Sequence, residues 1–275
     1  MFTGLGYADS SSSWPVARLG EAGDASGSAE VAEEVPIALV YNGRSHVVVM
    51  GTPSNLEDLA VGFTVTEAIV EDASRVERVD VVKASHGIEL QIQIPAAHAA
   101  LLERRSRGLV ARTGCGLCGV ETIKEAMRTP VRVGETLAID DGALWSAAAQ
   151  LGDQQTLNNR TNAVHAAAWA TRRGELDIVR EDVGRHNALD KVLGAVVRDG
   201  RMASAGFIVV TSRASYEMVQ KAATCSVELV AAISRPTSLA IRFAEASGVT
   251  LVGLLRGRSA NVYMRPERIT MGATT

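Results

Sequence analysis

Two cysteines, Cys115 and Cys118, carry the most reactive chemistry that the sequence offers. They lie two residues apart in the run RTGCGLCG at residues 112–119, where glycine recurs at every second or third position. Because glycine lacks a Cβ, such a run favours neither helix nor strand and predicts a loop on which the thiols can be reached. Arg105 and Arg112 precede the pair, and nearby positive charge favours the nucleophilic thiolate. The sequence therefore indicates thiolate chemistry at this loop.

The Cys-x-x-Cys spacing alone serves structural zinc binding, disulfide exchange and sulfur transfer. A structural zinc site needs four ligands, and only Cys225 and histidines such as His165 or His186 remain to complete one. A thioredoxin-like pair normally opens a helix directly after a strand and encloses a bulky residue, whereas Gly-Leu lies between these cysteines. Zinc deaminases carry His-x-Glu before Pro-Cys-x-x-Cys, but this sequence has no His-x-Glu, and Gly114 replaces the proline. We therefore expect no tightly bound metal, and the motif leaves the other two chemistries open.

Length, charge and cysteine count limit the class of protein. A chain of 275 residues can bury a sizeable core in one large or two modest domains. A formal charge of -3 argues against general nucleic-acid binding, which usually needs a strongly basic face. Three cysteines form no disulfide framework, and the sequence shows neither a membrane-spanning apolar run nor a secretory signal. We expect a soluble cytoplasmic protein that binds neither nucleic acid nor membrane.

The first half of the sequence predicts a disordered tail followed by a small α+β lobe. Residues 1–30 are rich in Gly, Ser, Ala and Asp, and such a segment buries too little apolar area to offset its ordering entropy. Asn42-Gly43 between two apolar runs predicts a hairpin, and Ser54 or Asn55 is expected to cap the helix that follows. Residues 79–82 and 88–94 read as further strands. The lobe is expected to span residues 31–135 and to end in the Cys-x-x-Cys loop.

The second half alternates between apolar strands and helices. Strands are expected at residues 207–210, 227–233 and 249–255, and helices at 214–224 and from Pro236 to Gly248. A β-α-β-α-β succession predicts a parallel sheet with helices on both faces. The predicted fold class is therefore α/β, with a parallel-rich sheet covered by helices at residues 136–275 beside the smaller N-terminal α+β lobe.

Arginine side chains follow each of these three strands, and hydroxyl side chains accompany them after the first two. Open α/β sheets bind ligands at the carboxyl ends of their strands, and phosphate groups are bound by arginines and hydroxyls next to helix N-termini. Polar strand ends are often simply solvated, but three such clusters at one edge predict a phosphate-bearing ligand. The residues are Thr211, Ser212 and Arg213, then Ser234 and Arg235, and last Arg256, Gly257 and Arg258.

A charged run at residues 180–191 precedes an amphipathic helix. Asp182 is expected to cap this helix, which places Arg185 and His186 near its first turn, where contacts with anions are favourable. For His186 a structural hydrogen bond is as good an interpretation as catalysis. His165, beside the run Ala166-Ala167-Ala168, also fits a buried strand histidine.

Together these segments resemble the FdhD/NarQ family of formate dehydrogenase accessory sulfurtransferases. The resemblance covers about residues 35–269, and several segments in one order make it specific. One departure is Asn162, which stands where similar proteins usually have glycine in a Thr-Gly-x-x-His pattern. The resemblance is carried by RTGCGLCG at 112–119, VHAAAW at 164–169, REDVGRHNALDK at 180–191, SRASYEMVQK at 212–221, PTSLA at 236–240, and the stretch from LVG at 251–253 to NVY at 261–263.

The resemblance implies a carrier that accepts sulfur from a cysteine desulfurase as a cysteine persulfide. The carrier passes the sulfur to the bis-molybdopterin guanine dinucleotide cofactor, which formate dehydrogenase then receives. It also implies a C-terminal fold similar to that of cytidine deaminases, and a homodimer is compatible with it. Cys115, nearer Arg112 than Cys118 is, resembles the persulfide-bearing cysteine, and Cys118 is expected to assist. The expected cofactor-binding residues are Leu254, Leu255, Arg256, Gly257, Arg258 and Ser259, with Ser212, Arg213, Ser234, His165, Arg185 and His186.

Two other functions fit the same residues. An escort protein would bind the molybdenum cofactor without transferring sulfur, and a thiol-disulfide oxidoreductase would reduce general disulfide substrates. Cys225, at the end of an apolar helix face, is expected to be a small core residue.

Overall fold

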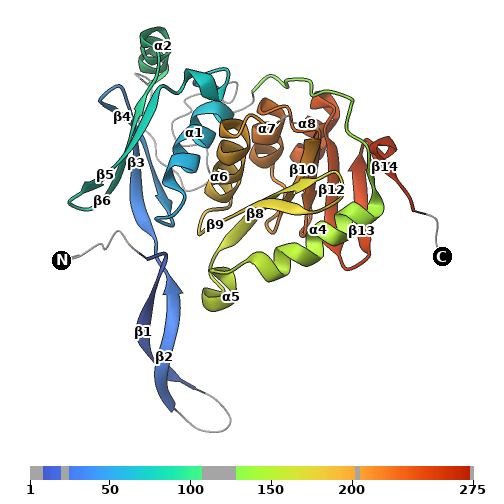
Figure 1. Ribbon diagram of the computed structural model, residues 1–275, viewed down its shortest axis with the longest axis horizontal. Coiled ribbons are helices and arrows are strands. Elements are labelled where there is room, and N and C mark those ends of the chain that lie inside the picture. The colour runs from blue at the N-terminus through green and yellow to red at the C-terminus, as the bar shows by residue number, and fades with distance from the viewer. Residues whose placement is uncertain (1–8, 20–24, 107–127, 202–204, 273–275) are drawn as a thin grey trace.

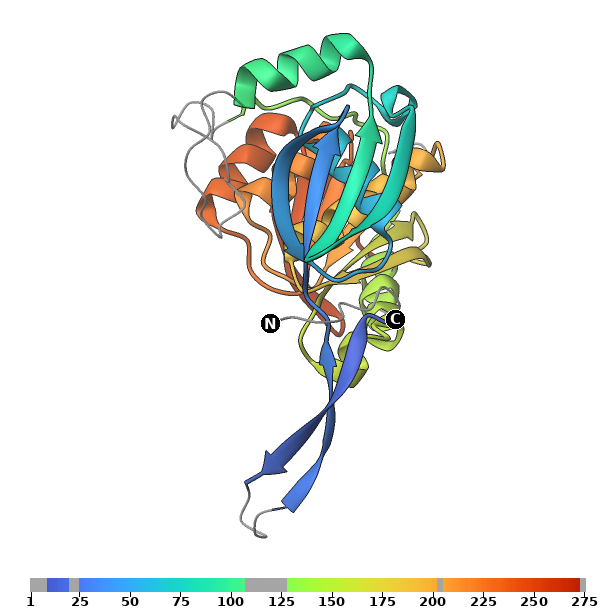
Figure 2. The same ribbon diagram turned by 90° about the vertical axis from the view of Figure 1, so that its left-hand side faces the viewer.

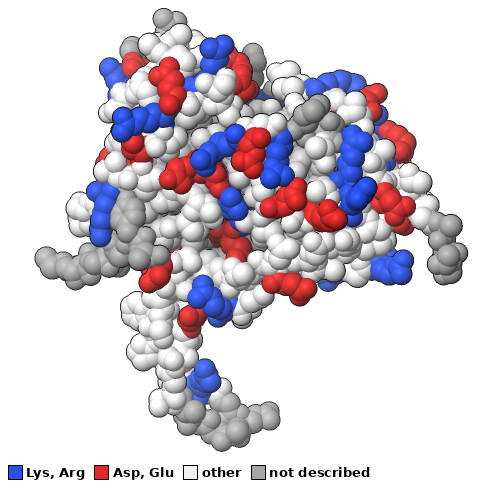
Figure 3. Space-filling model, viewed as in Figure 1, with Lys and Arg blue, Asp and Glu red and all other residues white. Residues whose placement is uncertain are grey.

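The computed structural model describes residues 9–19, 25–106, 128–201 and 205–272. Two lobes lie side by side, and an antiparallel hairpin projects from the smaller one (Figure 1). Cys115 and Cys118 lie outside the described residues, so the predicted reactive loop stays a prediction from the sequence. Acidic and basic side chains are interspersed over the face shown in Figure 3.

The smaller lobe is a four-stranded sheet in the order β4-β3-β6-β5 with helix α1 against it. Asn42 and Gly43 join β3 to β4 with positive φ angles of 49° and 80°, so the predicted hairpin is confirmed. Asn55 is the N-cap of α1, as expected, but it has a left-handed backbone and its side chain makes no capping bond. The elements are β3 Val35–Tyr41, β4 Arg44–Gly51, α1 Leu56–Thr66, η1 Ala73–Arg75, β5 Arg78–Ala84, β6 Gly87–Gln93 and α2 Ala96–Ser106.

The larger lobe is built on a six-stranded sheet in the order β13-β12-β11-β10-β8-β9. Strands β10, β11 and β12 are parallel, as predicted. Strand β13 pairs antiparallel with β12, β8 pairs antiparallel with β10, and β9 pairs antiparallel with β8; these three strands were not predicted. A short parallel pair, β7 with β14, lies apart from this sheet. The strands are β7 Ile139–Asp140, β8 His165–Thr171, β9 Leu176–Asp182, β10 Gly206–Val210, β11 Leu229–Ala232, β12 Thr250–Arg256, β13 Ser259–Met264 and β14 Ile269–Thr270.

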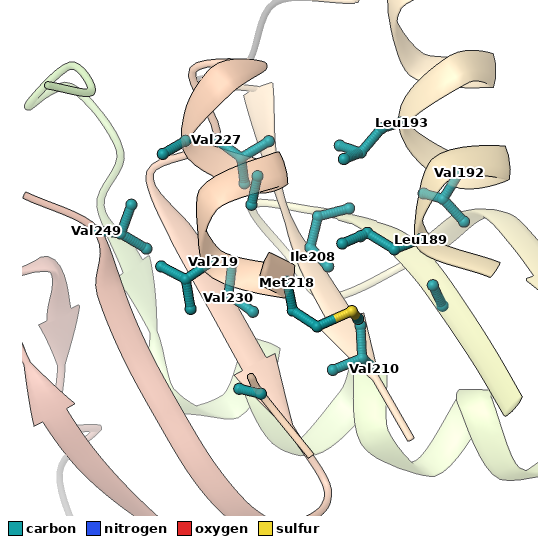
Figure 4. Packing of buried hydrophobic residues seen from close by; sticks show 14 of the residues in the cluster. Leu189, Val192, Leu193, Ile208, Val210, Met218, Val219, Val227, Val230 and Val249 are labelled. Carbon is teal, nitrogen blue, oxygen red and sulfur yellow. The ribbon is translucent and has the colours of Figure 1, made fainter. Parts of the chain in front are cut away.

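Helices cover both faces of the large sheet, which confirms the predicted α/β layering. Helices α6, α7 and α8 pack on one face, and α4 packs on the other. Figure 4 shows Leu189 and Leu193 of α6 directed toward Ile208 of β10. Val133 belongs to this core, a few residues before the predicted boundary at 135/136. The helices are α4 Asp141–Gln154, α5 Asn158–Thr161, α6 Arg185–Arg198, α7 Tyr216–Thr224, α8 Ser238–Ser247 and η3 Pro266–Arg268.

The two ends of α8 show which local sequence signals predicted a helix boundary correctly. Gly248 ends the helix with a φ of 77°, as predicted. Pro236 was expected at the first helical position, and this was wrong. Thr237 is the N-cap, because its hydroxyl accepts a hydrogen bond from the backbone N–H of Ala240 at 3.3 Å, so Pro236 lies just outside the helix.

The predicted disordered tail was wrong for the described residues before residue 31. Strands β1 (Ser11–Arg18) and β2 (Ala25–Ala32) form an antiparallel hairpin that extends away from both lobes (Figures 1 and 2). Composition accounts only for apolar burial, whereas the backbone hydrogen bonds of this ribbon are made between its own strands. Alternation also places Trp14 and Val31 on the same face of the ribbon, and Trp14 is 58% exposed.

Helices α1 and α6 join the two lobes at a pair of glycines. A Cβ on Gly62 would overlap the carbonyl oxygen of Asp190, and a Cβ on Gly194 would overlap that of Asp58. The two helices therefore touch through their backbones. At the edge of this contact, Asp58 binds Arg180 (2.8 Å) and Arg198 (2.6 Å).

Buried charges surround the same junction. The ammonium group of Lys221 on α7 contacts Asp190 on α6 at 3.0 Å and Glu67 after α1 at 2.7 Å. Lys221 and Asp190 are 5% and 1% exposed. Glu67 also pairs with Arg128, whose backbone N–H donates to the hydroxyl of Tyr216 at 2.8 Å. One network thus holds α1, α6 and α7 together.

A second buried pair corrects the predicted role of Asp182. It was expected to cap α6, but the N-cap is Gly184. Asp182 is fully buried and accepts hydrogen bonds from Lys191 Nζ (2.6 Å) and from the backbone N–H of Thr52 (3.0 Å). It also accepts one from the backbone N–H of Gly184 at 2.8 Å, which fixes the turn before α6.

The described helices include none that is long and apolar enough to span a membrane.

Candidate functional site

The predicted site residues meet at one edge of the large sheet. Parallel β10, β11 and β12 end there together, and β8 begins there because it runs antiparallel to β10. Backbone hydrogen bonds tie the strand ends to one another: Thr211 to Ala166 at 3.0 Å, Ile233 to Val210 at 2.9 Å, and Leu254 to Ser234 at 3.0 Å. The structure therefore brings Ser212, Arg213, Ser234, the segment 254–259, His165, Arg185 and His186 to this edge.

The end of β12 departs from regular strand geometry. The ladder with β13 shifts register between Gly253 and Arg256, and Leu254 has a φ of 54°. A bulky leucine in the left-handed region is strained, and strained backbone of this kind tends to cluster at functional sites and in turns. Gly257 follows with a φ of 55° in the two-residue turn that leads to Ser259. Arg256 and Arg258 flank this glycine and are exposed.

A hollow of about 420 Å³ lies between this edge and helix α4. Its volume falls within the range of small-molecule sites. Three expected cofactor-binding residues, Leu255, Arg256 and Gly257, line it beside Thr211. Trp145 of α4 lines the opposite wall and was missed by the sequence reasoning. The sequence marks Trp145 only as an aromatic residue within a helical apolar pattern. An ordinary core residue gives the same pattern, so this signal does not identify a site residue. An aromatic ring in such a hollow can stack against a planar base.

The N-termini of α6 and α7 meet on the other face of the same edge. His186 Nε2 lies 2.6 Å from Glu217 Oε2, and these side chains are 19% and 15% exposed. The approach is not aligned as a hydrogen bond, so this nitrogen is left without a hydrogen-bond partner among the described residues. Four further buried atoms lack such a partner in the described chain, and two of them belong to this group, Arg185 Nε and Ser215 Oγ. Ser215 is the N-cap of α7, yet its hydroxyl makes no capping bond. Glu217 and Ser215 were missed, since neither stands out in the sequence.

His165 borders this group from β8. It pairs with Asp182 across the ladder to β9 and is half-buried. Burial lowers the pKa of His165, and the positive charges of Arg185 and His186 lower it further. The backbone before it is set by Asn162, which ends α5 in a left-handed conformation with φ 51°. Asparagine adopts this conformation more readily than most other non-glycine residues, so Asn162 suits this turn.

The described residues hold no group of three or more His, Cys, Asp or Glu side chains arranged for a metal ion. Because Cys115 and Cys118 lie outside those residues, the expectation of no bound zinc stays a prediction. Cys225, at the end of α7, is partly buried and packs against the cores of both lobes. Burial, with a further contribution from Asp190, raises the pKa of its thiol to about 12.

Comparison with known proteins identifies relatives along nearly the whole chain. The FdhD/NarQ family model matches residues 32–270, so the hairpin lies almost entirely before the match. A protein of Xanthomonas euvesicatoria pv. vesicatoria named sulfur carrier protein FdhD is 49% identical over 242 residues, which cover 88% of this chain and 86% of the relative. A protein of the same name from Cupriavidus necator is 47% identical over 240 residues, covering 87% and 83%.

A solved structure gives the same fold. This is a crystal structure described as that of a formate dehydrogenase accessory protein from Desulfotalea psychrophila. It superposes with a TM-score of 0.74 and covers 95% of this chain and 100% of that chain, at 24% sequence identity. At that identity the likeness establishes the fold alone, and the predicted likeness to cytidine deaminases stays a prediction.

Proposed function

Because the chain belongs to the FdhD/NarQ family, we propose that it is a sulfur carrier that serves formate dehydrogenase. The observation that carries this proposal is the 49% identity, over 88% of the chain, to a protein named as a sulfur carrier. The segment with Cys115 and Cys118 lies inside the range that the family model matches. The grouping of arginines and hydroxyls at one sheet edge supports a phosphate-bearing partner for the same reaction.

Sulfur is accepted by thiolate attack. The Cys115 thiolate attacks the outer sulfur of a cysteine persulfide on the desulfurase, and the desulfurase thiolate leaves. A persulfide forms on Cys115 and one is lost from the donor, so the exchange needs neither oxidant nor reductant. Arg112, three residues before Cys115, favours the thiolate that this step needs.

Sulfur delivery uses the second cysteine. The Cys118 thiolate attacks the inner sulfur of the Cys115 persulfide, which forms a Cys115–Cys118 disulfide and frees hydrosulfide. The two electrons that reduce the transferred sulfur come from the two thiols. Hydrosulfide then replaces an oxygen ligand on the metal of the cofactor, and a dithiol reductant restores the thiol pair.

The substrate that receives the sulfur is the bis-molybdopterin guanine dinucleotide cofactor. Arg213, Arg256 and Arg258 are exposed at the sheet edge, where their guanidinium groups can bind pyrophosphate. The hollow beside Trp145 suits one guanine base. The cofactor is handed to formate dehydrogenase after it has received sulfur.

The sulfur-transfer step is tested by loading single-cysteine variants. Native protein and the variants Cys115→Ala, Cys118→Ala and Cys225→Ala are incubated with a cysteine desulfurase and cysteine, and added sulfur is counted by intact mass. We expect Cys115→Ala to gain no sulfur and to fail to activate formate dehydrogenase. Cys118→Ala should hold the sulfur without delivering it, and Cys225→Ala should behave as the native protein.

The outcomes separate the competing functions. Activation by Cys115→Ala but not by Cys118→Ala would reverse the two roles. Activation by both variants, with the cofactor still bound, would make the protein an escort rather than a carrier. Turnover of a general disulfide substrate without sulfur loading would identify a thiol-disulfide oxidoreductase.

Cofactor binding is tested separately by calorimetry with GDP and with the bis-guanine cofactor. Charge-assisted bonds to phosphate contribute about 1.5–3 kcal/mol, so Arg213→Ala and Arg256→Ala should each lose about ten- to a hundredfold in affinity. Arg173→Ala is the matched control, because Arg173 is exposed in the β8–β9 turn at the opposite edge. Unchanged affinity in both site variants would place the cofactor elsewhere.

A further inference from the structure

The pairing of His186 with Glu217 is not explained by packing alone. Both side chains are largely buried, and His186 Nε2 lies 2.6 Å from the carboxylate. When the ring is protonated this is an ion pair between α6 and α7. The poor alignment nevertheless leaves the Nε2 hydrogen-bonding direction without a partner among the described residues.

The unpaired groups beside it point to an oxygen-rich ligand. Buried polar atoms are almost always hydrogen-bonded, and each exception needs an explanation. Arg185 Nε and Ser215 Oγ are two such exceptions, and both can donate. Both belong to helix N-termini, Arg185 to the first turn of α6 and Ser215 to the cap of α7, where the backbone also favours negative charge. His186 Nε2, Arg185 Nε and Ser215 Oγ are therefore three potential donors for which the described residues supply no hydrogen-bond acceptor.

The charges around His186 come from four elements. Arg185 lies beside it on α6, Glu217 faces it from α7, and His165 lies nearby at the start of β8. Asp182, at the end of β9, is already engaged by Lys191. Glu217 is thus the one carboxylate among these groups that is paired with His186. The group adjoins the sheet edge of the proposed cofactor site, because Arg213 precedes Ser215 by two residues.

We propose that His186, held by Glu217, donates the proton with which an oxygen ligand of the cofactor's metal leaves as water when sulfur takes its place. This rests on the proposed function. The metal–oxygen bond breaks and a metal–sulfur bond forms. Hydrosulfide supplies one proton of the departing water and the His186 imidazolium supplies the other, so the metal keeps its oxidation state. Arg185 Nε and the Ser215 hydroxyl donate to oxygen atoms of the same ligand, and Glu217 is a positioning residue.

The test separates proton donation from loading and binding. His186→Gln and Glu217→Gln are compared with native protein for sulfur loading by mass, GDP affinity by calorimetry, and the rate of formate dehydrogenase activation across pH. A general acid contributes about 10²- to 10⁴-fold, so His186→Gln should load and bind normally while activating at least about a hundredfold more slowly. The fall in rate at alkaline pH should disappear in His186→Gln. Glu217→Gln should show a smaller loss.

Two controls address structure. His98→Gln removes a histidine that pairs with Glu71 at 2.9 Å on the smaller lobe, and it should leave every measurement unchanged. His186→Ala is assayed with and without added imidazole, because an external proton donor restores the rate only if the lost group donated a proton. Restoration supports the proposal even if the variant is less stable.

Each remaining outcome counts against the proposal. A native activation rate in His186→Gln excludes His186 as the donor. A slower rate matched by an equal loss of GDP affinity, with no restoration by imidazole, makes His186 a binding residue only. Failure of the proposed function looks different, because native protein itself would then gain no sulfur or Cys115→Ala would still activate the enzyme.

Discussion

Replacing Lys221 by methionine tests the buried network that joins the lobes. The ammonium group lies within 3.0 Å of Asp190, Glu67 and the Thr66 hydroxyl. Without it the Asp190 carboxylate keeps, among the described residues, only the hydrogen bond from the Thr66 hydroxyl at 2.7 Å, although Asp190 is 1% exposed. Breaking a buried pair on one side costs about 3–5 kcal/mol, because the remaining charge is buried without compensation. We expect a loss of that size in the free energy of unfolding at pH 8.

The loss should shrink in acid. Burial already raises the pKa of Asp190, and Lys221 is the main group that opposes this rise. In the Lys221→Met variant the folded-state pKa therefore climbs further above the unfolded value of about 3.9. Stability then falls as pH rises between these two values, by up to about 1.4 kcal/mol per pH unit. The variant should consequently lie closer to native stability at pH 5 than at pH 8.

Glu67 does not reverse this trend. Burial acts to raise its pKa, but Lys221 and Arg128 hold the pKa of Glu67 below its ordinary value in the native protein. A carboxyl with a lowered pKa adds stability above its unfolded pKa and loses it only as pH falls through the lowered value. Both pH 5 and pH 8 lie above the pH range in which this contribution is lost. Native protein therefore keeps the stabilisation from Glu67 at both pH values.

Urea unfolding at pH 5 and pH 8 measures both effects through the midpoint and slope. Lys83→Met is the matched control, since Lys83 is exposed on β5 and a surface substitution should stay within about 0.5 kcal/mol. Equal stability of Lys221→Met and native protein, or an equal loss at both pH values, would refute the reasoning about Asp190.

Two further predictions concern the helices and the third thiol. Gly194→Ala gains helix propensity of about 1 kcal/mol but places a Cβ on the carbonyl oxygen of Asp58, so we expect a net loss of about 1–3 kcal/mol and a lower Tm. Gly152→Ala on α4 meets nothing within 4 Å and should raise Tm; a rise in both variants would contradict the close helix contact. Cys225, with a pKa of about 12, should be ionised in only about one molecule in ten thousand at pH 8 and react with iodoacetamide roughly a thousandfold more slowly than a free thiol. Peptide mass mapping of native and urea-unfolded protein checks this, and equal labelling in both would show that the thiol is not protected.

Local signals in the sequence predicted local structure. Asn42-Gly43 and Gly248 adopt the positive φ angles expected of them, because such turns depend on a residue's own backbone freedom. The hairpin at residues 11–32 was missed, since a serine-rich composition conceals an alternation that pairs Trp14 with Ala29 and Ser12 with Val31. Its stability comes from hydrogen bonds along the ladder, which composition does not report.

The sequence predicted those parts of the candidate site whose positions depend only on the topology of the sheet. Strand ends of a parallel sheet share an edge, so the positions of Ser212, Ser234 and Arg256 followed from the strand order. The partners that complete the site were missed because they are distant in the sequence. Glu217 reaches His186 from the next helix, and Asp182 contacts Thr52 across 130 residues instead of capping its own helix. Such pairs leave no periodic pattern in the chain.

The contact between α1 and α6 also constrains how the protein is made. The groups that bind Thr66 belong to residues 124 and 155 positions later in the chain. At a synthesis rate of about 5–20 residues per second, α1 leaves the ribosome roughly 6–30 s before its partners exist. During that interval the face of α1 that will meet α6 is in water, and it carries Asp58 and Thr66 rather than an unbroken apolar stripe, with Glu67 directly after the helix. These polar groups, which later bind the two lobes to each other, keep the nascent helix hydrated until its partners are synthesised. This hydration lowers the tendency of the helix to aggregate before the larger lobe is complete.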